Sequence, residues 1–474
     1  MSVTSEIKQP TLIFFGYSWT LGHQLDAYQS NLVDAFVKRG FSVHVILSNY
    51  LADNANYGIR ADVSQEKIIS YIRDCGADLV LSMNHGAMTK NIQSSINCPI
   101  ISWIVDDIPH IFFPDGSDNL EAMFDGKVKV IISSTELHDQ FLRRIPSLKG
   151  RLFLLPAATN IEAFKGFENV KRHNISFVGS SLDLRDIYYF VNANLDENKQ
   201  TVGLILEAIK KMRENYRLDF SALMLELGLD QNPKIKEWGE EKFRMILANL
   251  ISNNERFQAI EALHELGVSL FGNKDWLNSL ATSTRVLECY QAGNVIRNHS
   301  QLVDIYQTSK ISINIPQIQV ESALPYRVFD IMASDSLLIT KYHPDSDAYV
   351  FFGKDFPAPM YKDVPHLKEL CHFYLNNEDA RKEIVKKCNL LISKGFSFDE
   401  RVEDILRLAS FSAPKDAQKT GSRVQLATDH FYSLLIINMD SREKLKLLLV
   451  HILRILTSKG LRKKLVSLFS MVDK

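Results

Sequence analysis

Short apolar runs alternate with segments of helical spacing through the first third of the chain, and this alternation limits the folds open to it. The runs with the length of strands are residues 11–17, 41–47, 78–82, 99–105, 128–133 and 151–155. Between them, apolar side chains recur every three or four positions, as on one face of a helix, in residues 24–39, 66–75 and 135–142. Strands that alternate with helices pair in parallel, and helices then cover both faces of the sheet. The sequence therefore predicts an α/β domain over residues 1–165.

The same pattern begins again after a polar link at residues 165–174. Strand-like runs occupy residues 174–180, 267–272, 310–315 and 336–340, and helical spacing occurs at residues 327–333, 367–375 and 378–393. The stretch from about 184 to 266 is rich in Leu, Glu, Lys and Arg and reads as helical. A chain of 474 residues has room for two such domains. We therefore expect a second α/β domain over residues 170–410, with a helical insertion at about 184–266.

The last part of the chain differs from both halves. Residues 413–425 are polar, and residues 430–473 carry many Leu and Ile side chains interspersed with Lys and Arg. We expect a linker and a helical appendage over residues 412–474. Basic amphipathic helices bind anionic lipid, so residues 430–474 could dock on a membrane surface or mediate self-association. The alternative is that their apolar face packs on the second domain or on another subunit.

Composition narrows the function classes. Lys and Arg total 55 and Asp and Glu total 56, which argues against a nucleic-acid-binding protein with an overall basic surface. No run approaches eighteen apolar residues, and the N-terminus lacks the pattern of a signal peptide. The five cysteines are scattered without CxxC spacing, so neither a disulfide scaffold nor a zinc site is expected. These features predict a cytoplasmic protein, in solution or peripheral to the membrane.

Candidate catalytic groups follow the strands of the first half. Ligands of doubly wound sheets bind outside the carboxyl ends of the strands. His23 follows a loop with two glycines, His85 follows the run at 78–82, and Asp106 and Asp107 follow the run at 99–105. Each could act as a general base toward an acceptor hydroxyl, and we favour them in the order Asp106, His23, His85, Asp107. The alternatives are a structural histidine and a capping or turn aspartate.

Candidate phosphate- and ribose-binding groups lie in the second half. Gly179, Ser180 and Ser181 follow its first strand, where small residues and backbone N–H groups suit a diphosphate. Arg327 and Asp330 lie three positions apart and so share one face of a predicted helix. An arginine there could pair with phosphate oxygens, and an aspartate could accept hydrogen bonds from ribose hydroxyls. The alternative is a local ion pair between the two.

Several motifs of other enzyme classes are missing. The sequence contains no HExxH, GxSxG or GxxxxGK[ST], and no DxD flanked by strands. The glycines at residues 16–22 do not have GxGxxG spacing. Zincin, α/β-hydrolase and P-loop functions thereby lose their main support, as does an oxidoreductase with a dinucleotide cofactor. We expect neither a metal nor a cofactor.

Six segments resemble those of the CgeB-like glycosyltransferases. In the second half they are residues 305–314, 327–334, 376–381 and 398–401; in the first half they are residues 102–107 and 155–160, followed by Phe164. The resemblance covers roughly residues 10–410. It implies the GT-B architecture, in which two Rossmann-like domains face one another across a cleft.

The resemblance also implies a function. A metal-independent transferase of this family would hold a nucleotide-activated sugar in the second domain, with Tyr326, Arg327 and Asp330 among the donor-binding residues. Arg327, helix dipoles and the N–H groups at 179–181 would stabilise the leaving diphosphate. The first domain would hold a glycan, a lipid-linked glycan or a protein as acceptor. The family usually has Glu at position 330 and Gly at positions 335 and 336, so a non-catalytic nucleotide-sugar-binding or scaffold protein remains the alternative.

Overall fold

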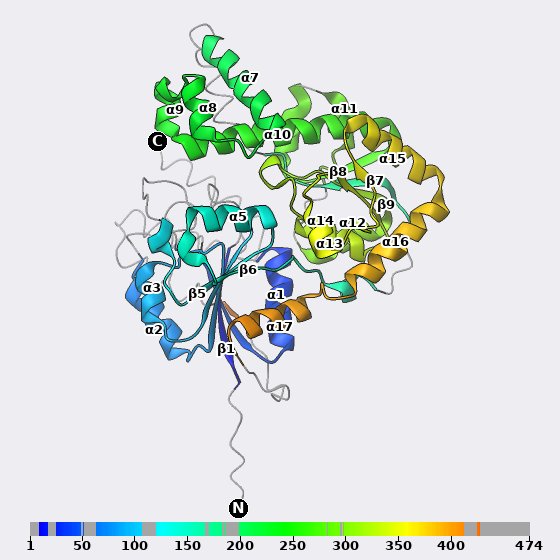
Figure 1. Cartoon of the computed structure of the whole chain (residues 1–474). Coiled ribbons are helices and arrows are strands. Elements are labelled where there is room, and N and C mark those ends of the chain that lie inside the picture. The colour runs from blue at the N-terminus through cyan, green and yellow to red at the C-terminus, as the bar shows by residue number, and fades with distance from the viewer. Residues whose placement is uncertain are drawn as a thin grey trace, which may run out of the picture.

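The chain folds into two α/β domains, each built around a parallel sheet (Figure 1). The computed structural model describes residues 9–17, 25–48, 51, 63–106, 120–165, 170–182, 184, 199–281, 283–293, 296, 298–411 and 424–426. The predicted fold class, two successive parallel α/β sheets, is confirmed. The predicted His23 and Asp107 sites lie outside the described residues.

The sheet of the first domain has the strand order β12-β2-β1-β3-β4-β5-β6, and every pairing is parallel. Its strands are β1 (Thr11–Gly16), β2 (Ser42–Leu47), β3 (Leu79–Met83), β4 (Ile100–Ile104), β5 (Val128–Ile132), β6 (Leu152–Leu154) and β12 (Val424–Leu426). Its helices are α1 (Ala27–Lys38), α2 (Gln65–Asp74), α3 (Lys90–Ser95) and α5 (Thr135–Arg144). Strand β1 is buried along its whole length, which explains why its sequence is an uninterrupted apolar run rather than an alternating one.

The sheet of the second domain has the strand order β11-β10-β9-β7-β8 and is also parallel. Its strands are β7 (His173–Val178), β8 (Val268–Phe271), β9 (Ser309–Asn314), β10 (Leu337–Lys341) and β11 (Met360–Tyr361). Its helices are α11 (Thr284–Cys289), α12 (His299–Thr308), α13 (Tyr326–Ala333), α14 (Asp347–Phe351), α15 (Val364–Asn376) and α16 (Glu378–Ile392). All four predicted strands, at 174–180, 267–272, 310–315 and 336–340, are present, as β7, β8, β9 and β10.

Between β7 and β8 the chain forms a helical insertion with its own apolar core. The insertion contains α7 (Lys199–Glu214), α8 (Phe220–Glu226) and α9 (Pro233–Trp238), and it leads into the long helix α10 (Glu240–Leu263). Trp238 and Phe220 pack around the fully buried Phe243 of α10. Gly239 has a φ of 77°, a conformation that favours glycine, and so separates α9 from α10. In Figure 1 the insertion extends from the second domain toward α5 of the first.

Helix α17 (Phe398–Leu408) follows the second domain in sequence but packs on the first. Its capping box at Ser397 and Glu400 starts the helix, and its apolar face meets α1. Arg39 of α1 pairs with Glu403, with Nε and Oε1 2.5 Å apart. The segment before α17 is tied to the earlier interdomain segment, because the Thr159 N–H donates to the Phe396 carbonyl at 2.9 Å. The interface is therefore spanned by two chain crossings that lie side by side.

The predicted linker at 413–425 contributes to the first sheet. Strand β12 (Val424–Leu426) begins in this linker and ends one residue beyond it. It pairs with β2 in register with Val43, His44 and Val45. The other residues of 412–474, including the predicted helical appendage, lie outside the described residues. Within the part of the chain that the structure describes, no helix is both long enough and apolar enough to cross a membrane.

We expect α17 to stabilise the first domain. Ile405 is fully buried, so Ile405→Ala should lower the free energy of unfolding of this domain by about 2–5 kcal/mol. Urea titration followed by circular dichroism measures the loss. The matched control is Leu390→Ala on the neighbouring α16, where the side chain is 61% exposed and the change should stay within about 0.5 kcal/mol. Equal effects of the two truncations would contradict a stabilising role for α17.

Candidate functional site

The carboxyl ends of the two sheets meet at the domain interface. Thr135 follows β5 of the first sheet, and its N–H donates to the carboxylate of Asp347, which follows β10 of the second sheet, at 3.2 Å. Beside this contact, the hydroxyl of Ser322, in the segment after β9, donates to Glu136 Oε2 at 2.8 Å. Because ligands of parallel α/β sheets bind at these strand ends, the interface is where a functional site is expected.

The loop after β7 is stabilised by hydrogen bonds within the protein. The Gly179 N–H donates to the Phe271 carbonyl at 2.9 Å, and the Ser181 N–H donates to Asn273 Oδ1 at 2.8 Å. Ser180 between them is exposed. Two of the three backbone groups that the sequence suggested for a diphosphate are therefore already in use. Backbone N–H groups of this loop are therefore not by themselves a diphosphate cradle in this structure.

Close packing of the β7 and β8 loops requires a glycine at position 272. A Cβ at Gly272 would lie 2.2 Å from the Gly179 carbonyl oxygen, which is closer than atoms can approach. The same carbonyl accepts a hydrogen bond from Trp276 Nε1 at 2.8 Å. The position of the Gly179–Ser181 loop is therefore fixed by β8 and the residues after it.

Two arginines lie against one aromatic ring beside this loop. The guanidinium carbons of Arg256, from α10, and Arg327, from α13, lie 6.0 and 5.9 Å from the centre of the Phe177 ring. Arg256 is 2% exposed and donates from Nη1 to the Ser180 carbonyl at 2.7 Å. Arg256 Nε and Arg327 Nη1 are buried without a hydrogen-bond partner among the described residues.

Neither arginine of this pair forms an ion pair with a carboxylate among the described residues, although the charge of the adjacent Glu255 favours the charged form of Arg256. Glu255, the neighbour of Arg256, pairs instead with Lys341 of β10, with Oε2 and Nζ 2.9 Å apart. Burial, and then the nearby charge of Arg327, lower the pKa of Arg256 to about 9. Burial also lowers the pKa of Arg327. Unpaired buried cations are costly, and an anion with two charges would satisfy both.

Arg256 was not among the residues that the sequence suggested. It lies in a long helical stretch, between Glu255 and Phe257, where a single arginine resembles an ordinary surface side chain. No motif marks it, and only the packing of α10 against β8 and the loop after β7 brings it to Arg327.

Asp330 does not pair with Arg327 among the described residues. Its Oδ1 accepts a hydrogen bond from Thr159 Oγ1 at 2.6 Å, and His299 Nε2 lies 3.8 Å from the same oxygen. Asp330 is 9% exposed. Arg327 lies against the Phe177 ring and Asp330 bonds to Thr159, so the two residues have different partners although they share a helix. Asp330 instead joins α13 to the first interdomain crossing.

Asp335 lies at the opposite edge of the sheet from the arginine pair. It precedes β10, so it belongs to the amino edge, where its carbonyl accepts hydrogen bonds from Lys171 Nζ at 3.1 Å and Arg381 Nη1 at 3.2 Å. Its negative charge therefore does not oppose an anion at the carboxyl edge.

Tyr326 connects the two domains. Its ring stacks on that of Tyr28 in α1, with ring centres 3.6 Å apart and an interplanar angle of 12°. Its hydroxyl is buried without a hydrogen-bond partner among the described residues. Burial raises the pKa of the Tyr326 phenol, and the charges of Asp26 and Asp106 act in the same direction. This stack thus brings Tyr326 near carboxylates of the first domain.

Asp106 is an exposed carboxylate at the end of β4. Its Oδ2 accepts a hydrogen bond from Asn84 Nδ2 at 2.7 Å, and Asn84 Oδ1 accepts from the Val105 N–H at 2.9 Å. Asn84 has a φ of 51°, in the left-handed region that asparagine tolerates better than most residues. The loop after β3 therefore orients the carboxylate of Asp106.

His85, in contrast, is fully buried. Its Nδ1 lies 2.6 Å from Ser102 Oγ, and its Nε2 lies 3.1 Å from the Met123 carbonyl, which can only accept. Burial lowers the pKa of His85 to about 4. The geometry favours the structural role over that of an acceptor base.

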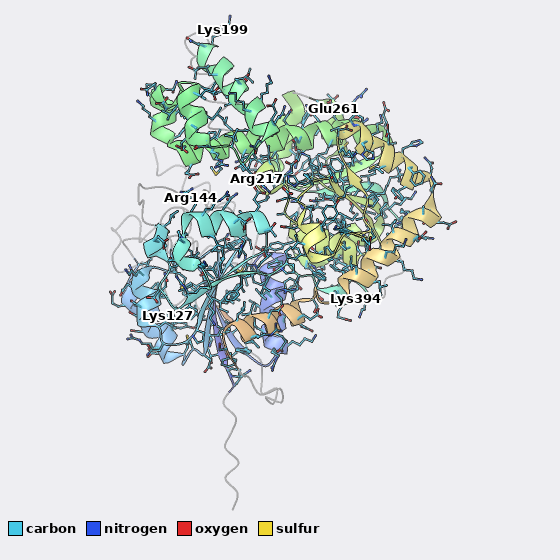
Figure 2. The ribbon with its side chains drawn as sticks, viewed as in Figure 1. Lys127, Arg144, Lys199, Arg217, Glu261 and Lys394 are labelled. Atoms are coloured by element: carbon cyan, nitrogen blue, oxygen red, sulfur yellow. The ribbon has the colours of Figure 1, made fainter. Side chains whose placement is uncertain are left out.

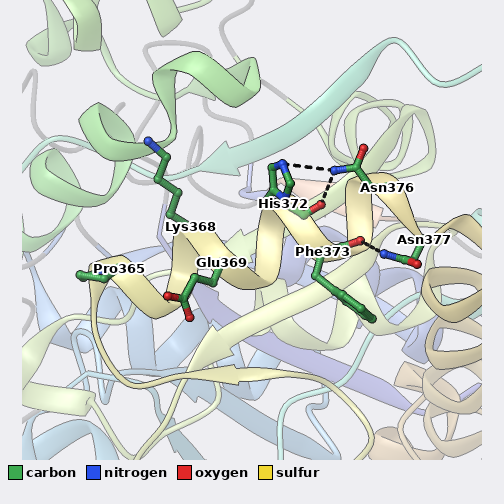
Figure 3. A pocket seen from close by; sticks show the side chains of 7 residues that line it. All are labelled: Pro365, Lys368, Glu369, His372, Phe373, Asn376 and Asn377. Carbon is green, nitrogen blue, oxygen red and sulfur yellow. Dashed lines mark hydrogen bonds between the residues drawn. The ribbon is translucent and has the colours of Figure 1, made fainter.

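A surface hollow on α15 does not include any of these residues. Figure 3 shows that its lining comes from one helix, and the lining residues are Pro365, Lys368, Glu369, His372, Phe373, Asn376 and Asn377. Asn376 Nδ2 donates to the His372 carbonyl within the helix at 2.8 Å, and Lys368 Nζ lies 3.5 Å from Glu265 Oε2 outside it. Among the described residues, no three His, Cys, Asp or Glu side chains gather as metal ligands, here or at the sheet edges.

The comparisons with known proteins agree with this geometry. A family model described as glycosyl transferase-like matches residues 254–407, a range that contains both Arg256 and Arg327. No curated protein matches the sequence. The predicted resemblance to glycosyltransferases is thereby supported at the level of a glycosyltransferase-like second domain, and the CgeB-like assignment stays a prediction.

Solved structures resemble the fold at low sequence identity. The sucrose-phosphate synthase of Thermosynechococcus elongatus has a TM-score of 0.50 and 10% identity, covering 84% of this chain and 98% of that one. HepE of Anabaena, solved with UDP and glucose, has a TM-score of 0.49 and 11% identity over 84% and 100% of the two chains. WaaG, a glycosyltransferase involved in lipopolysaccharide biosynthesis, has a TM-score of 0.49 and 11% identity, covering 83% of this chain and 99% of that one. The first of these likenesses shows the GT-B fold.

We expect Gly272→Ala to disturb the β7 loop. The added methyl must displace the Gly179 backbone, which should lower the free energy of unfolding by about 1–3 kcal/mol. Thermal unfolding measures this loss. Gly203→Ala is the matched control, because Gly203 lies within α7 with open space around it, and alanine should stabilise that helix by about 0.5–1 kcal/mol. A Gly272→Ala protein as stable as the wild type would contradict the close approach.

His85 should make the stability of the first domain depend on pH. The folded protein keeps His85 neutral down to about pH 4, whereas the unfolded chain takes up the proton near pH 6.5. Stability should therefore fall as the pH falls from 7 to 5, by about 2 kcal/mol from this group. Urea titrations of the wild type and His85→Gln at both pH values test this, since the variant should lose that part of the slope. An unchanged slope in the variant would assign the dependence to other groups.

Proposed function

We propose that this protein is a glycosyltransferase of the CgeB-like kind, which takes its sugar from a nucleoside-diphosphate donor without a metal ion. The second domain would hold the donor and the first domain the acceptor. The observation that carries the proposal is the pair of arginines with buried, unpartnered nitrogens at the carboxyl edge of the second sheet. The pair lies within the range matched by the glycosyl transferase-like family model, which supports a donor site at this edge.

The arginine pair would bind the diphosphate of the donor. Arg256 Nε and Arg327 Nη1 have no other partner among the described residues, and guanidinium groups form strong hydrogen bonds with phosphate oxygens. As the bond to the sugar breaks, negative charge grows on the diphosphate, and fixed cations in a water-poor site stabilise it. Ser180 is exposed beside them and lies in the loop that Arg256 holds.

Asp330 and Tyr326 would complete the donor site from α13. One oxygen of Asp330 already accepts from Thr159, but a carboxylate has four acceptor positions and could take a ribose hydroxyl as well. The hydroxyl of Tyr326 is available as a buried donor. The use of Asp where the family usually has Glu shortens the reach by one methylene group.

The acceptor would be activated in the first domain. Asp106 is exposed, it follows β4, and Asn84 orients its carboxylate, as a general base requires. His23 and Asp107 stay candidates, and the burial of His85 makes it the weakest of the four. The acceptor would be a glycan, a lipid-linked glycan or a protein.

Nucleotide binding tests the donor site. Calorimetric titration with UDP, GDP, ADP, CDP and dTDP should find at least one that binds the full-length protein. Arg256→Gln and Arg327→Gln should each weaken that binding by about 1.5–3 kcal/mol, since each removes a charged hydrogen bond. Arg285→Gln, on the exposed face of α11, should bind like the wild type. Unchanged affinity in both folded site variants would remove the arginine pair from the donor site.

Turnover separates an enzyme from a non-catalytic binding protein of the same fold. The protein is incubated with the sugar conjugate of the nucleotide that binds, and release of the free nucleoside diphosphate is followed. Slow release that is lost in Arg327→Gln supports a transferase. Tight binding with no release, in the presence or absence of acceptor glycans, would favour the non-catalytic alternative.

A further inference from the structure

Helix α5 of the first domain contacts both the second domain and the helical insertion. Its first residue, Thr135, bonds to Asp347 of the second domain. Its second residue, Glu136, bonds to Ser322 of the second domain and to Arg217 of the insertion. At its other end, Arg144 Nη1 lies 2.7 Å from Glu241 Oε1, at the start of α10. Figure 2 shows Arg144 and Arg217 in the space between α5 and the insertion.

Arg217 forms ion pairs with both domains. Its Nε lies 3.3 Å from Glu136 Oε1 in the first domain, and its Nη1 lies 3.4 Å from Asp345 Oδ2 in the second. The side chain of Glu136 is only 7% exposed, whereas that of Asp345 is 66% exposed. The contact with Glu136 is therefore the stronger of the two, because water screens it least.

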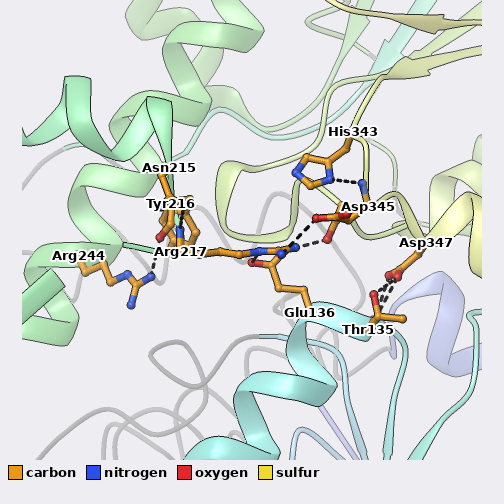
Figure 4. Close-up of polar contacts among 10 residues, drawn as sticks. Thr135, Glu136, Asn215, Tyr216, Arg217, Arg244, His343, Asp345 and Asp347 are labelled. Carbon is orange, nitrogen blue, oxygen red and sulfur yellow. Dashed lines mark hydrogen bonds and ion pairs between the residues drawn. The ribbon is translucent and has the colours of Figure 1, made fainter. Parts of the chain in front are cut away.

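The loop that carries Arg217 is anchored to α10. Arg244 of α10 donates from Nη2 to the Tyr216 carbonyl at 2.9 Å, and its guanidinium carbon lies 4.7 Å from the centre of the Tyr216 ring. The Arg217 N–H donates to Asn215 Oδ1 at 3.0 Å. Figure 4 shows Arg217 extending from this anchored loop toward Glu136 and Asp345. The position of Arg217 is thus fixed by the insertion, not by either sheet.

These contacts lie apart from the covalent connections between the domains. The two chain crossings and α17 run along one side of the interface, whereas the insertion reaches α5 from another side (Figure 1). A movement that separates the sheets about the crossings would pull α5 away from Arg217, Ser322 and Asp347. The insertion therefore stands where it can resist opening of the interface.

We propose that the helical insertion is an interdomain clasp, in which Arg217 holds Glu136 of α5 and so keeps the two domains closed. Without Arg217, the closed arrangement would leave the buried carboxylate of Glu136 with Ser322 as its remaining partner in the contacts described. Losing the ion pair to Arg217 therefore raises the free energy of the closed state more than that of an open state, because water solvates the Glu136 carboxylate in the open state. The clasp goes beyond the proposed transferase function and does not depend on a donor.

The amide of Thr135 reports directly on opening. As the first residue of α5, it has no acceptor within its own helix, and the structure gives it the carboxylate of Asp347 across the interface. Hydrogen exchange at Thr135 is therefore slow only while the domains are closed. Amides of β1 and β7 lie within the sheets and serve as internal references.

The experiment compares hydrogen exchange in the full-length wild type and in Arg217→Ala, without any nucleotide, by mass spectrometry with single-residue fragmentation. We expect exchange at Thr135 to become roughly tenfold faster or more, the scale of one hydrogen bond to a charged group. Exchange in β1 and β7 should stay unchanged. Arg213→Ala, an exposed arginine on α7, is the matched control and should behave like the wild type.

A second variant separates the ion pair from general loosening of the insertion. This variant combines Arg217→Ala with Glu136→Gln. Glutamine at position 136 is neutral, so closure no longer buries an unpaired charge, and hydrogen exchange at Thr135 should return toward the wild-type rate. Unchanged exchange at Thr135 in Arg217→Ala would overturn the clasp, as would equal acceleration in β1 and β7. Because no donor is used, either result leaves the test of the transferase function independent.

Discussion

Parallel strand pairing places every loop that follows a strand at the same edge of its sheet, and the arrangement of this protein depends on that constraint. In the first sheet the loops after β3, β4 and β5 share one edge; in the second, the loops after β7, β9 and β10 do. The two edges are turned toward one another, as the contacts of Thr135 and Glu136 with the second domain show. Polar groups far apart in sequence thereby line one interface.

At this interface the structure accepts local costs that a purely structural protein would avoid. Two arginines lie against one aromatic ring without forming ion pairs to carboxylates among the described residues, and the Tyr326 hydroxyl is buried without a hydrogen-bond partner there. The same edge requires a glycine at position 272 so that the two loops can approach. Unsatisfied buried polar groups are more often retained at functional sites than in cores. The pattern is consistent with a site that a charged ligand completes.

The two domains are held together by different kinds of contact on different sides. Near the crossings, Tyr326 stacks on Tyr28, and Asp330 bonds to Thr159. At the insertion, the contacts are hydrogen bonds and ion pairs, with Arg217 between the domains. Aromatic packing changes little when charges are screened, whereas an ion pair weakens with salt where its groups are exposed, as at Asp345. The interface thus has an aromatic contact near the crossings and ion pairs at the insertion.

The sequence by itself determined the two sheets, most of their strands and several groups at their carboxyl ends. A strand that is buried on both faces appears in the sequence as a continuous apolar run. The parallel order of the strands follows from their alternation with helices. It predicted that Asp106 follows a strand and that Arg327 lies at the start of a helix, which are their places after β4 and in α13. It did not reveal Arg256, whose helix gives no sign of what it packs against, nor that Arg327 and Asp330 face different partners. It did not show that α17 and β12 join the first domain, or that Arg217 reaches α5. Those features depend on contacts between residues distant in sequence, and local periodicity tells which face is buried but not which surface covers it.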